Sequence, residues 1–179
     1  MRRILFLTAT CILCLATTTS AFNGQRKGFV LGGSFGFAPT SSWSVEHYSD
    51  LEDSGPGFGL ALIIGGAFDE KNMLVYEGNV TSWNSNHVTV AQGFNGPAWY
   101  HYFGPTGHSA FTAAGLGFYV FNAEHFEEND PGLGLLFGGG YEFAPHWQVG
   151  AYVSYGKTSD PIFNYSHYHV SILVTGIAF

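Results

Sequence analysis

The feature that most constrains this chain is an alternation of large apolar residues with small or polar ones, repeated along most of its 179 residues. Because successive side chains of a β-strand point to opposite faces, a period of two predicts strands with one apolar face. The segment GFVLGGSFGFA puts Phe29, Leu31, Phe35 and Phe37 on one face and Val30, Gly32, Ser34 and Gly36 on the other. Segments beginning near residues 57, 72, 132 and 147 repeat the pattern.

Three further segments complete the set, although two of them are irregular. Pro97 interrupts the segment over 88–103, and the pattern does not decide whether Trp99 or Tyr100 and Tyr102 face outward. The segment over 109–121 carries apolar residues on both faces, and the last strand runs over 166–179. We therefore expect an all-β fold, an eight-stranded antiparallel up-and-down transmembrane β-barrel.

The connections between the expected strands support this order. DEKN, GPTG and APH form tight turns at the second, fourth and sixth connections, whereas most of the other connections are longer or more polar. The first connection, expected from Pro39 to Pro56, contains four acidic residues. We interpret it as a solvated loop, with calcium bridging to surface lipopolysaccharide or a host ligand as the alternative. The four acidic residues are Glu46, Asp50, Glu52 and Asp53.

The composition indicates that the larger side chains face lipid. Only 11% of the residues are charged, against about 25% in soluble domains, while 17% are aromatic. No segment after the N-terminal one approaches the length of about 18 apolar residues that a spanning helix needs. Aromatic residues expected at the two margins of the lipid belt are Phe29, Phe68, Phe143, Trp147 and Phe179 at the tight turns, and Phe37, Tyr155 and Tyr168 at the other end. A soluble, lipocalin-like binder, with its apolar face inward, is the alternative.

The N-terminal residues 1–21, MRRILFLTATCILCLATTTSA, have the charged start, short apolar core and small residues of a secretory signal peptide. We expect this segment to be cleaved and residues 22–179 to form the barrel domain. Both cysteines, Cys11 and Cys14, would then be lost, so no disulfide is expected. The formal net charge of −7 argues against a nucleic-acid partner.

The C-terminal residues HVSILVTGIAF carry a family resemblance. They are similar to the C-terminal signal of bacterial outer-membrane barrels, which ends in an aromatic residue with apolar residues at alternate preceding positions. Here the matching positions are Leu173, Ile177 and Phe179. With the signal peptide and the eight strands, the chain resembles small barrels of the OmpA/OmpX type, the outer membrane protein beta-barrel domain family.

The resemblance implies a bacterial outer-membrane location and recognition of the last strand by the barrel assembly machinery. Its other expected partners are outer-membrane lipid and lipopolysaccharide, and we expect a monomer. The same fold serves many purposes, so it implies no single activity. We expect a non-enzymatic structural or surface-interaction protein, or a conduit for small solutes.

Polar residues on the face opposite the apolar one define the expected lumen. They are Glu77, Asn79, Glu142, Gln148 and Tyr152. A buried carboxylate requires a partner, and basic residues are scarce in this chain. Two interpretations stay open: a hydrogen-bonded lumen, or a polar path for solutes.

A lipid-modifying hydrolase is the remaining alternative. Outer-membrane lipid A deacylases carry a His-x-Ser motif on the outer face of a barrel, and His169 and Ser171 are similar in spacing and would face lipid. The Asn-Ala that follows in that family is replaced by Ile172 and Leu173, and no acidic residue is placed to orient His169. His167 and His169 lack a third ligand, so we expect no metal and no cofactor.

Overall fold

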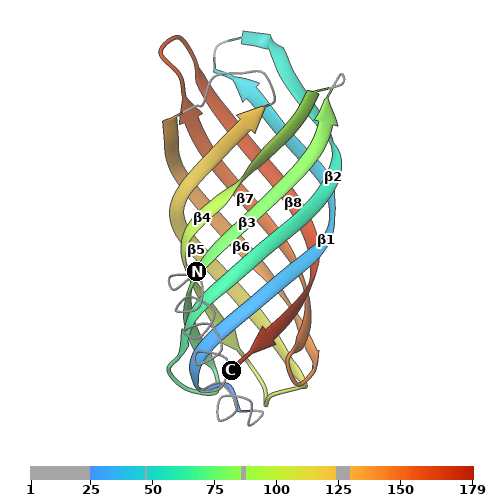
Figure 1. Ribbon diagram of the computed structural model, residues 1–179, viewed down its shortest axis with the longest axis vertical. Coiled ribbons are helices and arrows are strands. Elements are labelled where there is room, and N and C mark those ends of the chain that lie inside the picture. Colours follow the sequence, from blue (N-terminus) through green and yellow to red (C-terminus); the bar gives the residue numbers. More distant parts are fainter. Residues whose placement is uncertain (1–24, 47, 86–87, 124–129) are drawn as a thin grey trace, which may run out of the picture.

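The computed structural model describes residues 25–46, 48–85, 88–123 and 130–179, so the expected signal peptide lies outside the described residues. Eight antiparallel strands form one closed barrel (Figure 1). They are β1 (Gly28–Val45), β2 (Tyr48–Ala67), β3 (Asn72–Ser85), β4 (Val88–Tyr102), β5 (Ser109–Ala123), β6 (Asp130–Ala144), β7 (Trp147–Ser159) and β8 (Asn164–Ala178). No helix among the described residues is long and apolar enough to cross a membrane.

Closure of the barrel depends on the pairing of the first and last strands. β1 pairs with β8 from Leu31, opposite Ala178, to Val45, opposite Tyr165. Every strand therefore has a neighbour on both sides, and the barrel has no open edge. This arrangement satisfies the backbone polar groups internally, as a hydrocarbon environment requires.

The two ends of the barrel differ. The tight-turn end is formed by the connections at residues 68–71, 103–108 and 145–146, and the C-terminus lies there (Figure 1). At the opposite end, called the hairpin end here, β1 and β2 pair as far as Val45 and Tyr48. The tight second, fourth and sixth turns predicted from the sequence are confirmed.

The first connection differs from the prediction. Most of the residues expected to form a long loop between Pro39 and Pro56 lie in β1 and β2, with Ser44 paired to Glu52. The polar residues of this segment suggested a loop, because a strand formed by them would have no apolar face. Above the lipid belt, however, backbone pairing holds a strand together without one.

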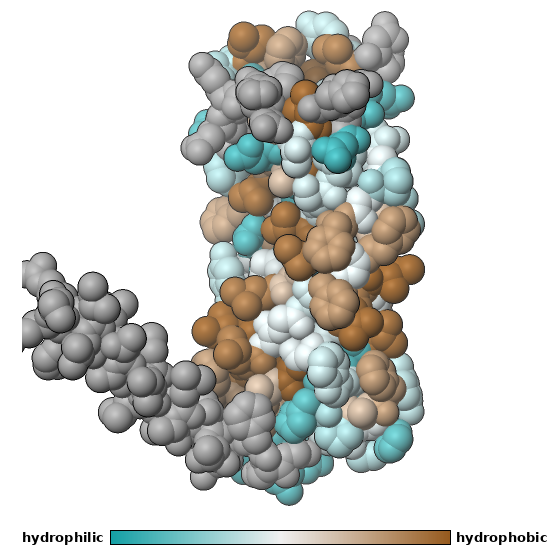
Figure 2. All heavy atoms as spheres, turned by 45° about the vertical axis from the view of Figure 1, so that its right-hand side comes forward, coloured by the Kyte–Doolittle hydropathy of each residue, from teal (hydrophilic) through white to brown (hydrophobic). Residues whose placement is uncertain are grey.

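Large apolar side chains cover the outside of the barrel. Leu62 is 61% exposed and Phe35 58%, whereas Val30 and Leu136 are fully buried inside. Brown, hydrophobic side chains gather over the middle and lower part of the face in Figure 2. A soluble binder would show the opposite arrangement, with its apolar face inward. On the irregular fourth strand, Trp99 faces outward, and Tyr100 and Tyr102 face inward.

The last strand has the opposite orientation from the one predicted. Phe179, Leu173 and Ile177 are buried inside the barrel, and the Phe179 ring lies 4.9 Å from that of His146, between centroids. Period-two reasoning could not choose the face, because the other face of β8 is apolar too, with Ile172 exposed to the outside. Phe179 is therefore not part of the outer aromatic belt. The other aromatic residues expected there are all exposed: Phe29, Phe37, Phe68, Phe143, Trp147, Tyr155 and Tyr168.

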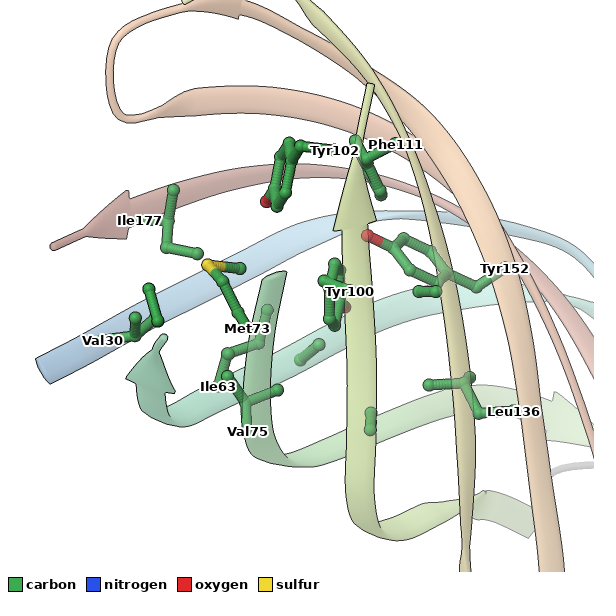
Figure 3. Packing of buried hydrophobic residues seen from close by; sticks show 14 of the residues in the cluster. Val30, Ile63, Met73, Val75, Tyr100, Tyr102, Phe111, Leu136, Tyr152 and Ile177 are labelled. Carbon is green, nitrogen blue, oxygen red and sulfur yellow. The ribbon is translucent and has the colours of Figure 1, made fainter. Parts of the chain in front are cut away.

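Glycines on other strands make room for the interior aromatic rings. A methyl group on Gly156 would overlap the Tyr119 side chain, and one on Gly138 would overlap the Tyr152 ring. Aromatic rings therefore occupy the space beside these inward glycines, which is not left open. Figure 3 shows Tyr100, Tyr102, Tyr152 and other buried side chains of this interior cluster converging from different strands.

Candidate functional site in the barrel interior

A buried ion pair closes the interior at the tight-turn end. Arg26 precedes β1 and enters the barrel, where its Nη2 lies 3.1 Å from Oε2 of Glu142 on β6. Both side chains are fully buried. The guanidinium also donates to the carbonyl oxygens of Gly104, at 3.1 Å, and Glu70. Arg26 therefore ties the start of β1 to two of the three tight turns.

Neighbouring groups complete this end of the interior. The Gly107 backbone N–H donates to Glu142 at 2.7 Å. The Arg26 guanidinium carbon lies 3.9 Å from the centroid of the Tyr102 ring, and the Tyr102 hydroxyl donates to Gln148 at 2.7 Å. Cation–π contact and charge-assisted hydrogen bonds offset part of the desolvation of a buried charge. Sequence reasoning missed Arg26, because it precedes the first predicted strand.

The middle of the interior holds a second carboxylate. Glu77 on β3 accepts hydrogen bonds from the Tyr100 hydroxyl at 2.7 Å and from the Asn79 amide at 3.2 Å. Glu77 forms no ion pair with any described residue. Neutral donors therefore hold this carboxylate, and the predicted lumen residues Gln148 and Tyr152 are buried in the same interior.

Two histidines of β8 occupy the upper part of the interior. His169 lies within hydrogen-bond distance of Ser154, at 2.9 Å, and of the Tyr119 hydroxyl, at 3.1 Å. His167 lies 2.8 Å from Thr158 and stacks on Tyr119 with the ring planes 13° apart. The pair therefore contributes to a packed polar layer.

The inward orientation of β8 removes the geometry that a lipid-facing hydrolase would need. His169 and Ser171 were expected to face lipid, but both are fully buried inside. The Ser171 hydroxyl makes no hydrogen bond to any described residue, so His169 does not activate it. Lipid outside the barrel cannot reach either side chain. No three described His, Cys, Asp or Glu residues are grouped so as to hold a metal ion.

Ionic contacts link the strands at the hairpin end. Lys157 of β7 pairs with Glu46, next to the β1–β2 turn, and Ser166 of β8 donates to the same carboxylate at 3.3 Å. In the β7–β8 turn, the Tyr165 hydroxyl and two backbone N–H groups donate to Asp160 and hold the pKa of that carboxyl below its ordinary value. These donors therefore stabilise the ionised form of the Asp160 carboxyl.

Comparison with known proteins finds solved structures that share the fold of this chain, although sequence comparison finds none. No protein-family model matches the chain, and no curated protein is significantly similar to it in sequence. The crystal structure of neisserial surface protein A is similar, with a TM-score of 0.57 and 14% identity over 83% of this chain and 96% of that one.

Two further solved structures align less closely. Ail, the attachment invasion locus protein of Yersinia pestis, gives a TM-score of 0.47 and 18% identity over 86% of this chain and 99% of its own. The outer membrane protein OprG of Pseudomonas aeruginosa gives 0.46 and 13% over 87% and 98%. The closed topology and the similarity to neisserial surface protein A give this chain the fold of the small outer-membrane barrels, which confirms the resemblance predicted from the sequence.

Proposed function

We propose that this chain is an integral outer-membrane protein of a Gram-negative bacterium, exported by a cleaved signal peptide at residues 1–21. It acts without catalysis, through the strand hairpins at the hairpin end, and its lumen does not conduct solutes. The fold and the apolar outer surface support membrane residence. The extended, polar β1–β2 hairpin supports an interaction role beyond the lipid belt.

The main observation that favours a closed lumen over a conduit is that large side chains fill the interior along its length. Arg26 and Tyr102 lie near the tight turns, Tyr100 and Tyr152 lie further in, and Tyr119 follows above, each with an exposed fraction of 1% or less. Eight strands enclose a space that side chains can fill. Most of the interior polar groups are paired with one another, so a hydrated ion passing through would have to break several of these bonds.

The proposed partners are those expected for a protein inserted in the outer membrane. Outer-membrane lipid and lipopolysaccharide cover the apolar belt, and the assembly machinery recognises the last strand. Leu173, Ile177 and Phe179 are the candidate recognition residues within that strand. Because these three side chains end inside the barrel, recognition takes place before closure.

Conductance in planar lipid bilayers tests the closed lumen. Refolded protein, whose insertion is verified by a mobility shift on unboiled gels, should give no discrete current steps. Opening of steady channels would contradict the proposal. If such currents were cation-selective and Glu77→Gln reduced that selectivity, the conduit function would replace it.

A further inference from the structure

An unpaired amide lies on the lipid-facing surface. Asn95 is the central residue of β4, which has 15 residues, and its side chain faces outward because its neighbour Phe94 is fully buried inside. Its partners across the sheet are Gly78 of β3 and Phe118 of β5. The next outward position beyond Gly78 is Leu62, which is 61% exposed. The amide is therefore surrounded by apolar surface.

No described residue satisfies this amide. Asn95 makes no side-chain hydrogen bond within the described chain, although its carboxamide carries two N–H donors and an acceptor oxygen. A polar group without a partner in hydrocarbon is costly. Thr112 of β5, another outward polar side chain, also makes no side-chain hydrogen bond to a described residue, but its single hydroxyl leaves fewer unsatisfied sites than the carboxamide of Asn95.

The surface around Asn95 is hollowed. Gly78 lies beneath the amide, since a Cβ on Gly78 would come within 3.0 Å of the Asn95 Oδ1 atom. A groove of about 500 Å³ runs beside the amide over β2 and β3. Its outward apolar side chains are Leu60, Leu62, Ile64, Tyr76 and Val80. Small residues at such a position allow two membrane-embedded backbones to approach closely.

We propose that this face binds a second copy of the same chain, with the two Asn95 amides paired across a two-fold axis. A carboxamide is its own complement, because its N–H can donate to the oxygen of an identical group while its oxygen accepts in return. The groove has no charged lining residue that would select a charged partner. The proposal rests on membrane insertion, and it replaces the monomer expected from the sequence.

Dimerisation in vesicles tests the proposal. Donor- and acceptor-labelled protein, reconstituted at decreasing protein-to-lipid ratios, should show energy transfer beyond random proximity. Asn95→Leu should weaken association by about three- to thirty-fold, the range that a hydrogen bond within a membrane contributes. Asn95→Gln, which keeps the amide, should retain more association than Asn95→Leu. Thr112→Val, which removes another outward polar group, should behave as the wild type.

Cross-linking locates the contact. With both natural cysteines in residues 1–21, Val80→Cys should cross-link to itself through a short bifunctional maleimide, and Asn95→Leu should reduce the yield. Val153→Cys on the outer face of β7 should not cross-link. Equal association of Asn95→Leu and wild type, or cross-links only to a different protein, would overturn the proposal. Failure to insert, seen as no mobility shift on unboiled gels, would instead contradict membrane residence.

Discussion

Among the described residues, Arg26 is the one buried arginine or lysine, and it pairs with one of the two interior carboxylates. Arg26 is fully buried and contacts Glu142, which lies 116 positions away in the chain. Neither residue suggests its partner from local sequence: Arg26 lies outside the alternating pattern, and Glu142 is one of 13 acidic residues. Only closure of the barrel brings them together. The presence of an interior carboxylate was therefore predictable, whereas the source of its counter-charge was not.

Removing the cation alone should destabilise the barrel more than removing both charges. Arg26→Met leaves the Glu142 carboxylate buried and unpaired, which costs about 3–5 kcal/mol. Adding Glu142→Gln should recover much of this loss, because the glutamine oxygen still accepts from the Gly107 N–H. Urea unfolding in lipid vesicles measures these differences. Additive effects of the two substitutions, or a loss under about 1 kcal/mol for Arg26→Met, would contradict the assigned pairing.

At the scale of the strands, alternation predicted the correct faces of β1, β2, β3, β6 and β7. Where both faces are apolar, alternation did not decide the orientation. In β5, Phe111 and Tyr119 point inward while Leu116 and Phe118 point outward. In the structure, Gly140 and Gly132 of the neighbouring β6 lie opposite Phe111 and Tyr119, and this pairing across strands cannot be read from the β5 segment alone. Because both faces of β8 are apolar too, its orientation was predicted the wrong way round. His169 and Ser171 were expected to face lipid, but they lie in the interior.

Replacing the glycine beneath Tyr119 should destabilise the barrel. Gly156→Ala places a methyl group against the base of the Tyr119 side chain, which cannot swing away, so we expect a loss of at least about 1–3 kcal/mol. Gly33→Ala is the matched control, since nothing lies within 4 Å of the added methyl group. It should stay within about 1 kcal/mol of the wild type. The refolded fraction on unboiled gels and the urea midpoint are the readouts, and equal behaviour of both variants would refute the packing described.

As a whole, the molecule is a closed sheet with an apolar exterior, a packed interior and one polar, extended end. The low charge, the abundance of aromatic residues and the eight segments were enough to predict this class. The length of the hairpin end was not predictable, because polar strands that project beyond a lipid belt have the composition of loops. Most of the loop-like sequence at 39–56 nevertheless forms paired strands, which extend the barrel at the hairpin end.

Three of the four tryptophans test most directly whether the outward face meets lipid and the interior is closed. Trp99 and Trp147 are about half exposed on the outer surface, whereas Trp83 is buried inside. In single-tryptophan variants reconstituted with lipids brominated on their acyl chains, the fluorescence of Trp99 and Trp147 should be strongly quenched. Trp83 should be little affected by bromine or by aqueous acrylamide. Equal quenching of all three by the brominated lipid, or quenching of Trp83 alone, would contradict the account.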